Sequence, residues 1–187
     1  MDGVGDLERW AADARAREAA DARVRERWLQ AQAVEGASMA GVLLDLAERR
    51  ETVVVATVAG RRHRGAVTGV GEDFVAIQAP SGTVTLVALS GLADVRVAER
   101  ATRSSSRVAA NTGDRPGRGS LGARLADVLA QAAAGRPRIL VQTAAASVVG
   151  DLRAVGLDVL TVQTDGDAGP VYVSLPSLSE ISFLASG

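Results

Sequence analysis

Arginine side chains gathered in one short stretch are the residues of this chain that most clearly suggest a binding chemistry. The stretch "GRRHRGAVTGV" begins at Gly60, and another pair of arginines ends the segment just before it. Guanidinium groups neutralise phosphate charges, so this cluster predicts contact with a nucleic-acid backbone. Glutamates lie close in sequence, so an ordinary solvated surface is the alternative interpretation. The predicted nucleic-acid-binding residues are Arg61, Arg62, Arg64, Arg49 and Arg50.

Residues for catalysis are scarce. His63 is the only histidine, and the chain has no cysteine. Nucleophilic catalysis needs a nucleophile beside a base, and the sequence has neither a GxSxG nor a paired-carboxylate motif. The stretch "RPGRGS" at 115–120 lacks the lysine and the spacing of a phosphate-binding loop. We therefore expect a protein that is not an enzyme, with no catalytic residues, no metal site and no cofactor.

Two matched glycine–aspartate pairs suggest turns. Asp73 follows Gly71 at a spacing of two, and Asp158 follows Gly156 in the same way, each just before an apolar strand. Glycine readily takes a positive φ, and an aspartate side chain accepts hydrogen bonds from the N–H groups of a turn. We expect these four residues to be structural, and a role as ligands is the alternative.

Both tryptophans lie in the N-terminal segment, which is otherwise polar and rich in alanine and charged pairs. Trp10 and Trp28 are 18 residues apart. In a helix that spacing is five turns, so the two rings share one face about 27 Å apart. They are predicted to form a partner interface, and docking on the remainder of the same chain is the alternative.

Composition limits the class of protein. The chain has 187 residues, 47% of them apolar, and a formal net charge of −1. All 21 cationic side chains are arginines, as a GC-rich bacterial genome would encode. The absence of cysteine, of a secretory signal and of a stretch of about 18 apolar residues indicates a cytoplasmic protein that does not enter a membrane.

Periodicity and turn signals divide the chain into four segments. Residues 1–36 read as a charged helix, and 99–119 as a flexible linker rich in Arg, Ser and Gly. Residues 37–98 and 120–187 each read as a helix followed by five short strands rich in β-branched residues. Such a strand set closes most simply as a small barrel, which removes its edges.

The last two segments are similar to each other in sequence. "GAVTGVGEDFVAIQ" at 65–78 matches "GDLRAVGLDVLTVQ" at 150–163 with an offset of 85. This register indicates an internal repeat. The stretch "RRHR" at 61–64 has become "AAAS" at 144–147, so we expect the first copy to contact a ligand and the second to pack.

The repeated stretches carry a resemblance to a known family. "RGAVTGVGEDFVAI" and "VGDLRAVGLDVLTV" resemble the first motif of Sm-like (LSm, Hfq-type) barrels, and "VALSGLADVRV" and "VSLPSLSEISF" resemble their last two strands. An SH3-like barrel, as in the C-terminal domain of RimP, is the second match. The resemblance covers 38–98 and 120–184 and implies two tandem five-stranded small barrels, each preceded by a helix. With the long charged N-terminal helix, this gives a mainly β protein with helices.

The family's usual base-binding residues do not carry over. Its aspartate and asparagine positions are occupied by Gly71 and Val75 in the first copy and by Gly156 and Leu160 in the second. The resemblance and the arginines favour a non-catalytic, RNA-associated regulator that binds single-stranded RNA. The alternative is a protein-interaction or oligomeric scaffold that uses the tryptophan-bearing helix, with a protein partner or a homo-oligomer as the assembly.

Overall fold

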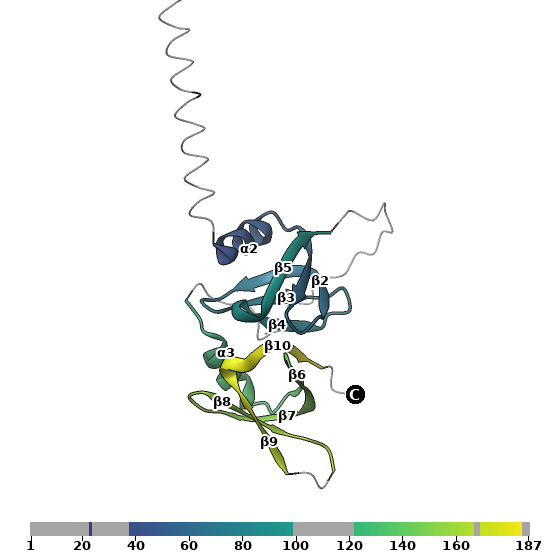
Figure 1. Cartoon of the computed structure of the whole chain (residues 1–187), viewed down its shortest axis with the longest axis vertical. Coiled ribbons are helices and arrows are strands. Elements are labelled where there is room, and N and C mark those ends of the chain that lie inside the picture. Colours follow the sequence, from purple (N-terminus) through teal and green to yellow (C-terminus); the bar gives the residue numbers. More distant parts are fainter. Residues whose placement is uncertain (1–22, 24–37, 99–121, 167–168, 185–187) are drawn as a thin grey trace, which may run out of the picture. The chain divides into compact units, whose positions relative to one another are not determined.

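The structure, a computed structural model shown in Figure 1, describes Arg23 and residues 38–98, 122–166 and 169–184. Two compact units are distinguished, residues 1–38 and residues 39–187, and every strand of the described ranges belongs to the second. Apart from Arg23, the predicted N-terminal helix lies outside the described residues, and so does the predicted linker. No helix within the described ranges is long and apolar enough to cross a membrane.

Each half of the second unit is a short helix followed by five strands. The first half, residues 39–98, contains α2 (Met39–Glu48), β1 (Thr52–Thr57), β2 (Arg62–Val70), β3 (Phe74–Gln78), β4 (Val84–Ala88), the 3-10 turn η1 (Leu89–Gly91) and β5 (Leu92–Val97). The second half, residues 122–184, contains α3 (Leu125–Ala133), β6 (Arg138–Thr143), β7 (Ser147–Val155), β8 (Val159–Gln163), β9 (Pro170–Ser174), η2 (Leu175–Ser177) and β10 (Leu178–Phe183). Both predicted sets of five strands are therefore observed.

The prediction of two separate five-stranded barrels is wrong. The strands form one antiparallel sheet in the order β5-β1-β2-β3-β4-β10-β6-β7-β8-β9, with only two short helices in the described part of the chain. The sheet does not close, because β5 and β9 are its two edges. The physical reason is that β4 pairs with β10 of the other half. The backbone N–H and C=O groups on the outer edge of β4 are satisfied there, and not by closing the first half on itself.

The strands pair by the same scheme in both halves, which lets positions be compared. Val53 pairs with Gly65 in the first half, and Ile139 pairs with Gly150 in the second. We call residues that hold the same place in this scheme counterparts. A Cβ at either glycine would collide with the carbonyl of the neighbouring strand, at Gln78 in the first half and at Gln163 in the second, so both positions require glycine.

This scheme corrects the alignment of the arginine stretch. Val55 pairs with His63, and its counterpart Val141 pairs with Val148. The counterparts of residues 62–64 are therefore residues 147–149, which agrees with the offset of 85, so the match of "RRHR" to the "AAAS" stretch at 144–147 is two residues out of register. Residue by residue, the counterparts of Arg62, His63 and Arg64 are Ser147, Val148 and Val149.

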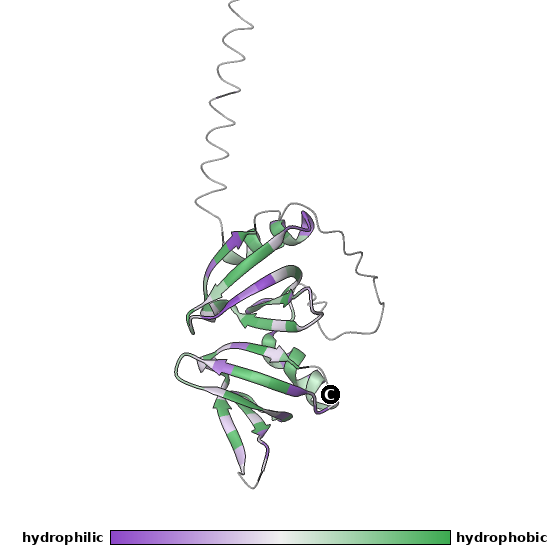
Figure 2. Ribbon diagram, turned by 90° about the vertical axis from the view of Figure 1, so that its right-hand side faces the viewer, coloured by the Kyte–Doolittle hydropathy of each residue, from purple (hydrophilic) through white to green (hydrophobic). Residues whose placement is uncertain are grey.

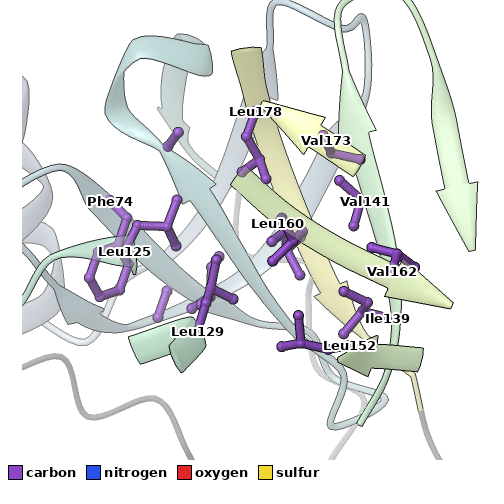
Figure 3. Packing of buried hydrophobic residues seen from close by; sticks show 14 residues of the cluster. Phe74, Leu125, Leu129, Ile139, Val141, Leu152, Leu160, Val162, Val173 and Leu178 are labelled. Carbon is purple, nitrogen blue, oxygen red and sulfur yellow. The ribbon is translucent and has the colours of Figure 1, made fainter. Parts of the chain in front are cut away.

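Hydrophobic side chains pack in two clusters, and apolar residues fill much of the strands in both halves (Figure 2). The first cluster lies within the first half, where α2 packs Leu43 and Leu46 against the sheet. The second cluster joins the halves: Phe74 of the first half packs with Leu125 and other residues of the second (Figure 3). Leu86 of the first half belongs to the same cluster. The β4–β10 junction is therefore part of a hydrophobic core.

Candidate functional site

The arginine-rich strand β2 presents its side chains to two different faces. His63 pairs with the buried Val55 and is itself largely buried, whereas Arg62 and Arg64 are exposed. Neighbouring residues of a strand point to opposite faces. His63 therefore points inward, and the two arginines lie on the outer face.

His63 and Arg61 meet a buried carboxylate from the other half. Glu180 on β10 has a side chain only 1% exposed, and its Oε2 lies 2.7 Å from Nε2 of His63. Arg61 Nε lies 2.7 Å from the other oxygen, Oε1. Oε1 accepts no directed hydrogen bond from the described residues, so the Arg61 contact is an ion pair only. Two residues of the "RRHR" stretch thus serve the contact between the halves.

The outer face of β5–β1–β2 brings three arginines together. Arg64 and Arg96 both pair with Val54, from opposite sides, and Arg62 pairs with Ala56. Directly paired residues point to the same face of a sheet. We call this surface the arginine face. Sequence reasoning missed Arg96, because it lies in β5, far from the hairpin along the chain.

The arginine face also carries an acid. Asp94 pairs with Ala56 on the side opposite Arg62, and it accepts hydrogen bonds from Arg96 Nε at 3.1 Å and Nη2 at 3.3 Å. The Arg96 side chain is nevertheless 69% exposed. The face therefore has a positive excess, with part of the charge of Arg96 compensated locally.

The other predicted nucleic-acid-binding residues lie elsewhere. Arg49 and Arg50 follow α2, before the Thr52 end of β1, whereas Arg62 pairs with Ala56 near the opposite end. Arg49 is bound to Asp45 one helical turn earlier, with Nη2 and Oδ1 3.0 Å apart. The structure does not bring this pair of arginines to the arginine face.

The first predicted turn, which contains Gly71 and Asp73, contacts the residues with which the second half begins. Gly71 does not have a positive φ, contrary to expectation; it is required because a Cβ there would collide with the ring of Phe74. Asp73 accepts a hydrogen bond at 2.7 Å from the backbone N–H of Leu125, which starts α3. The side chain of Asp73 therefore caps a helix of the other half.

An ion pair also joins the first turn to the start of α3. Arg124 donates to Glu72 from Nε at 3.0 Å and from Nη2 at 2.7 Å. The hydrogen bond, and then the charge of Arg124, hold the pKa of Glu72 below its ordinary value. Both side chains are at least half exposed, so the pair contributes little to stability.

The second predicted turn is open. Gly156 and Asp158 are exposed, and Leu157 between them, the counterpart of Glu72, is 99% exposed. Gly156 also lacks a positive φ, and its Cβ would come within 2.9 Å of Val159. The backbone carbonyls of the two aspartates nevertheless accept equivalent hydrogen bonds. The carbonyl of Asp73 accepts from the N–H of Leu89 and that of Asp158 from the N–H of Leu175, each at 2.8 Å.

A groove of about 490 Å³ lies between the two turns and the start of α3. It is lined by apolar side chains, four of them leucines, together with three carboxylates, one arginine and one serine. Among the described residues no three potential metal ligands cluster. The lining residues are Glu72, Asp73, Ala88, Leu89, Ser90, Arg124, Leu125, Ala126, Leu157, Asp158, Leu175 and Pro176.

Two further findings bear on the predicted sites. Trp10 and Trp28, the predicted partner interface, lie outside the described residues. Glu180, which organises the junction, was missed; the signal for it was a lone acid inside the apolar strand "LSEISF". In comparisons with known proteins, no protein-family model matches the chain, and no curated protein is significantly similar to it in sequence.

Proposed function

We propose that the chain is a non-catalytic binding protein that contacts the phosphate backbone of single-stranded RNA through the arginine face. The observation that carries the proposal is the placement of Arg62, Arg64 and Arg96 on one exposed face of three adjacent strands. Residues two apart on a strand are about 7 Å apart, so the guanidinium groups offer several closely spaced contacts.

The side chains between the arginines define the mode of binding. Val54 and Ala56 are small and apolar, and no aromatic ring pairs with them on this face. Stacking on aromatic rings provides much of the affinity of proteins that read bases in single strands. The proposed contact is therefore with the backbone, with little preference for sequence and with strong dependence on salt.

The test is fluorescence anisotropy of labelled U-rich and A-rich single-stranded RNA, titrated with the full chain at low and at physiological salt. Two to three phosphate contacts predict about a tenfold loss of affinity when salt rises fourfold. Arg62→Ala and Arg64→Ala together are expected to remove most of this dependence. Arg61 is left unchanged because it holds Glu180.

The matched control is Arg153→Ala, which removes one positive charge from an exposed position on β7 of the second half. Affinity is expected to stay within about twofold of the unchanged chain, because a distant charge acts only through the screened field. No binding at low salt, or an equal loss per charge removed from the Arg62→Ala/Arg64→Ala double variant and from Arg153→Ala, would exclude the arginine face as an RNA site.

A second candidate function is assembly with other proteins. Exposed large hydrophobic side chains on β5 and β9, Val97 and Tyr172, favour it. The proposed partner interface of Trp10 and Trp28, the similarity to Sm-like barrels, and a cytoplasmic place in a GC-rich bacterium remain predictions from the sequence.

A further inference from the structure

Each edge strand of the sheet occupies the position in the pairing scheme of its own half that a junction strand occupies in the other half. In the first half β4 is the last strand of the pairing scheme and β5 is the first, and in the second half these places belong to β9 and β10. The junction joins β4 to β10. The edges left over, β9 and β5, are therefore the two strands that the same kind of junction would join.

The counterparts across these strands are fixed by the pairing. Ala76 pairs with Leu86 in the first half, and Thr161 pairs with Tyr172 in the second, so Tyr172 is the counterpart of Leu86. Val53 pairs with Val97, and Ile139 pairs with Phe183, so Val97 is the counterpart of Phe183.

The helices follow the same scheme. Arg50 and Arg136 both have positive φ, and each donates its backbone N–H to the residue three before it, Ala47 and Ala133 respectively. Counting back equally from these two arginines makes Met39 the counterpart of Leu125.

Exposure differs sharply between these counterparts. Leu86 and Leu125, which are 0% and 5% exposed, are buried where the halves meet. Tyr172 is 69% exposed and Met39 is 41% exposed. Val97 is 53% exposed, while Phe183 packs against the shared core. The open edges thus present hydrophobic side chains at places that the junction uses for burial.

We infer that a second copy of this chain docks head to tail, with its β9 added to β5 of the first copy in the register of the β4–β10 junction. An edge strand with unpaired backbone groups is a template for such addition. The contact joins two different surfaces, so copies continue into a ring or an open chain according to the rotation between them.

Several side chains make this contact weaker than the internal junction. Gly91 lies so close to Ser179 that a Cβ there would be 2.6 Å from its Cα, and the counterpart of Gly91 is Ser177. Pro170, at the start of β9, offers no N–H to a neighbouring strand. The association is therefore expected to be reversible.

The buried acid has no matching partners at the edges. Asp94 is the counterpart of Glu180, and the residues in the places of Arg61 and His63 are Ala146 and Val148. Asp94 instead binds Arg96 of its own strand. This difference again makes the contact between copies weaker than the junction within one copy.

Cysteine cross-linking tests the register directly, because the chain has no cysteine of its own. At the junction Thr85 pairs with Ser182, and their hydroxyl oxygens are 2.8 Å apart. Their counterparts at the open edges are Val171 and Arg96. Chains carrying Val171→Cys are mixed with chains carrying Arg96→Cys under mild oxidation, and a disulfide-linked dimer of the two is expected.

The controls separate the alternatives. Each single-cysteine chain alone is expected to give no dimer, and Ser147→Cys, exposed on β7 away from both edges, is expected to give only background with Val171→Cys. Dimers of Arg96→Cys alone or of Val171→Cys alone would show a symmetric edge contact and overturn the inference. An absence of cross-linking in the mixture would overturn it as well.

Sedimentation velocity over a concentration series gives the second test. Tyr172→Asp blocks β9 and Val97→Asp blocks β5, and each variant alone is expected to need at least about tenfold higher concentration to associate. An equimolar mixture of the two is expected to form dimers and nothing larger, since one intact edge of each kind remains. A chain that stays monomeric at every concentration contradicts the inference.

Discussion

The closed junction and the open edges are built from the same strands of the two halves, yet only one of them is a core. At the junction Phe74 and Leu86 are fully buried against the second half. At the open edge their counterparts are Val159, which is half-buried, and Tyr172, which is exposed. A few side chains therefore decide whether a strand of this pairing scheme is buried in a core within the chain or remains at an exposed edge.

The charged residues differ between the junction and the edges in the same way. Arg61 and His63 meet the buried Glu180, whereas the corresponding acid of the first half, Asp94, is partly exposed. The arginine stretch is therefore present in only one half in part because only that half faces a buried carboxylate. Arg62 and Arg64, which point outward, need another explanation, and the proposed RNA contact supplies one.

The largest effect is expected from Phe74→Ala. Its ring is fully buried in the core that joins the halves, so the substitution is expected to lower the free energy of unfolding by about 3–5 kcal/mol. The control Val159→Ala at the counterpart position is expected to cost about 1 kcal/mol or less, because that side chain is half-exposed. Urea unfolding of the full chain measures both, and equal losses would mean that Phe74 does not hold the halves together.

The next effect concerns the close approach at η1. Gly91→Ser introduces a Cβ 2.6 Å from the Cα of Ser179, so backbone must move, at a cost of about 1–3 kcal/mol. The reverse change, Ser177→Gly, is expected to alter stability by less than about 1 kcal/mol, since it removes one exposed hydrogen bond to Ser174. Because it frees space at the open edge, it is also expected to strengthen association between copies. Thermal unfolding and sedimentation report the two effects, and an unchanged stability of Gly91→Ser would contradict this geometry.

A smaller effect is expected from Glu180→Ala. The charge-assisted hydrogen bond to His63 is lost, but a carboxylate no longer has to be buried, so the net loss is about 1–2 kcal/mol. Asp94→Ala removes the counterpart acid, which is 42% exposed, and is expected to cost about 0.5 kcal/mol or less. Denaturant unfolding of both variants tests the difference. A larger loss from the Asp94 variant would reverse the comparison between the junction and the edges.

The sequence predicted the elements but not the way in which they join. The run of β-branched residues in "TVVVAT" and the glycines at the turns, Gly60 and Gly82, are local signals, and the strands occur where these signals place them. Pairing of β4 with β10 is a choice between distant partners, and sequence periodicity does not distinguish them. The arginine cluster was predicted from neighbours along the chain, so Arg61 was assigned to nucleic-acid binding, and its contact with Glu180, 119 positions away, was not foreseen.

The smallest expected effect concerns Glu72→Gln and depends on pH. Arg124 lowers the folded pKa of Glu72, so the stabilisation is complete above the ordinary glutamate pKa of about 4.3 and is lost as pH falls through the lowered value. The difference in unfolding midpoint between the unchanged chain and Glu72→Gln should therefore be present at neutral pH and vanish in strong acid. Asp165, whose pKa Arg138 lowers, is common to both proteins and cancels.

The counterpart Leu157 provides the control, because a leucine cannot titrate. Leu157→Gln is expected to differ from the unchanged chain by the same amount at neutral and at acidic pH. A difference for Glu72→Gln that also stays constant with pH would mean that the Arg124 contact does not form in solution. The ion pair between Glu72 and Arg124 lies at the junction, and the counterpart position at the open side carries a leucine. A pH dependence that appears with Glu72→Gln and not with Leu157→Gln would therefore show that the contact between α3 and the first half forms in solution.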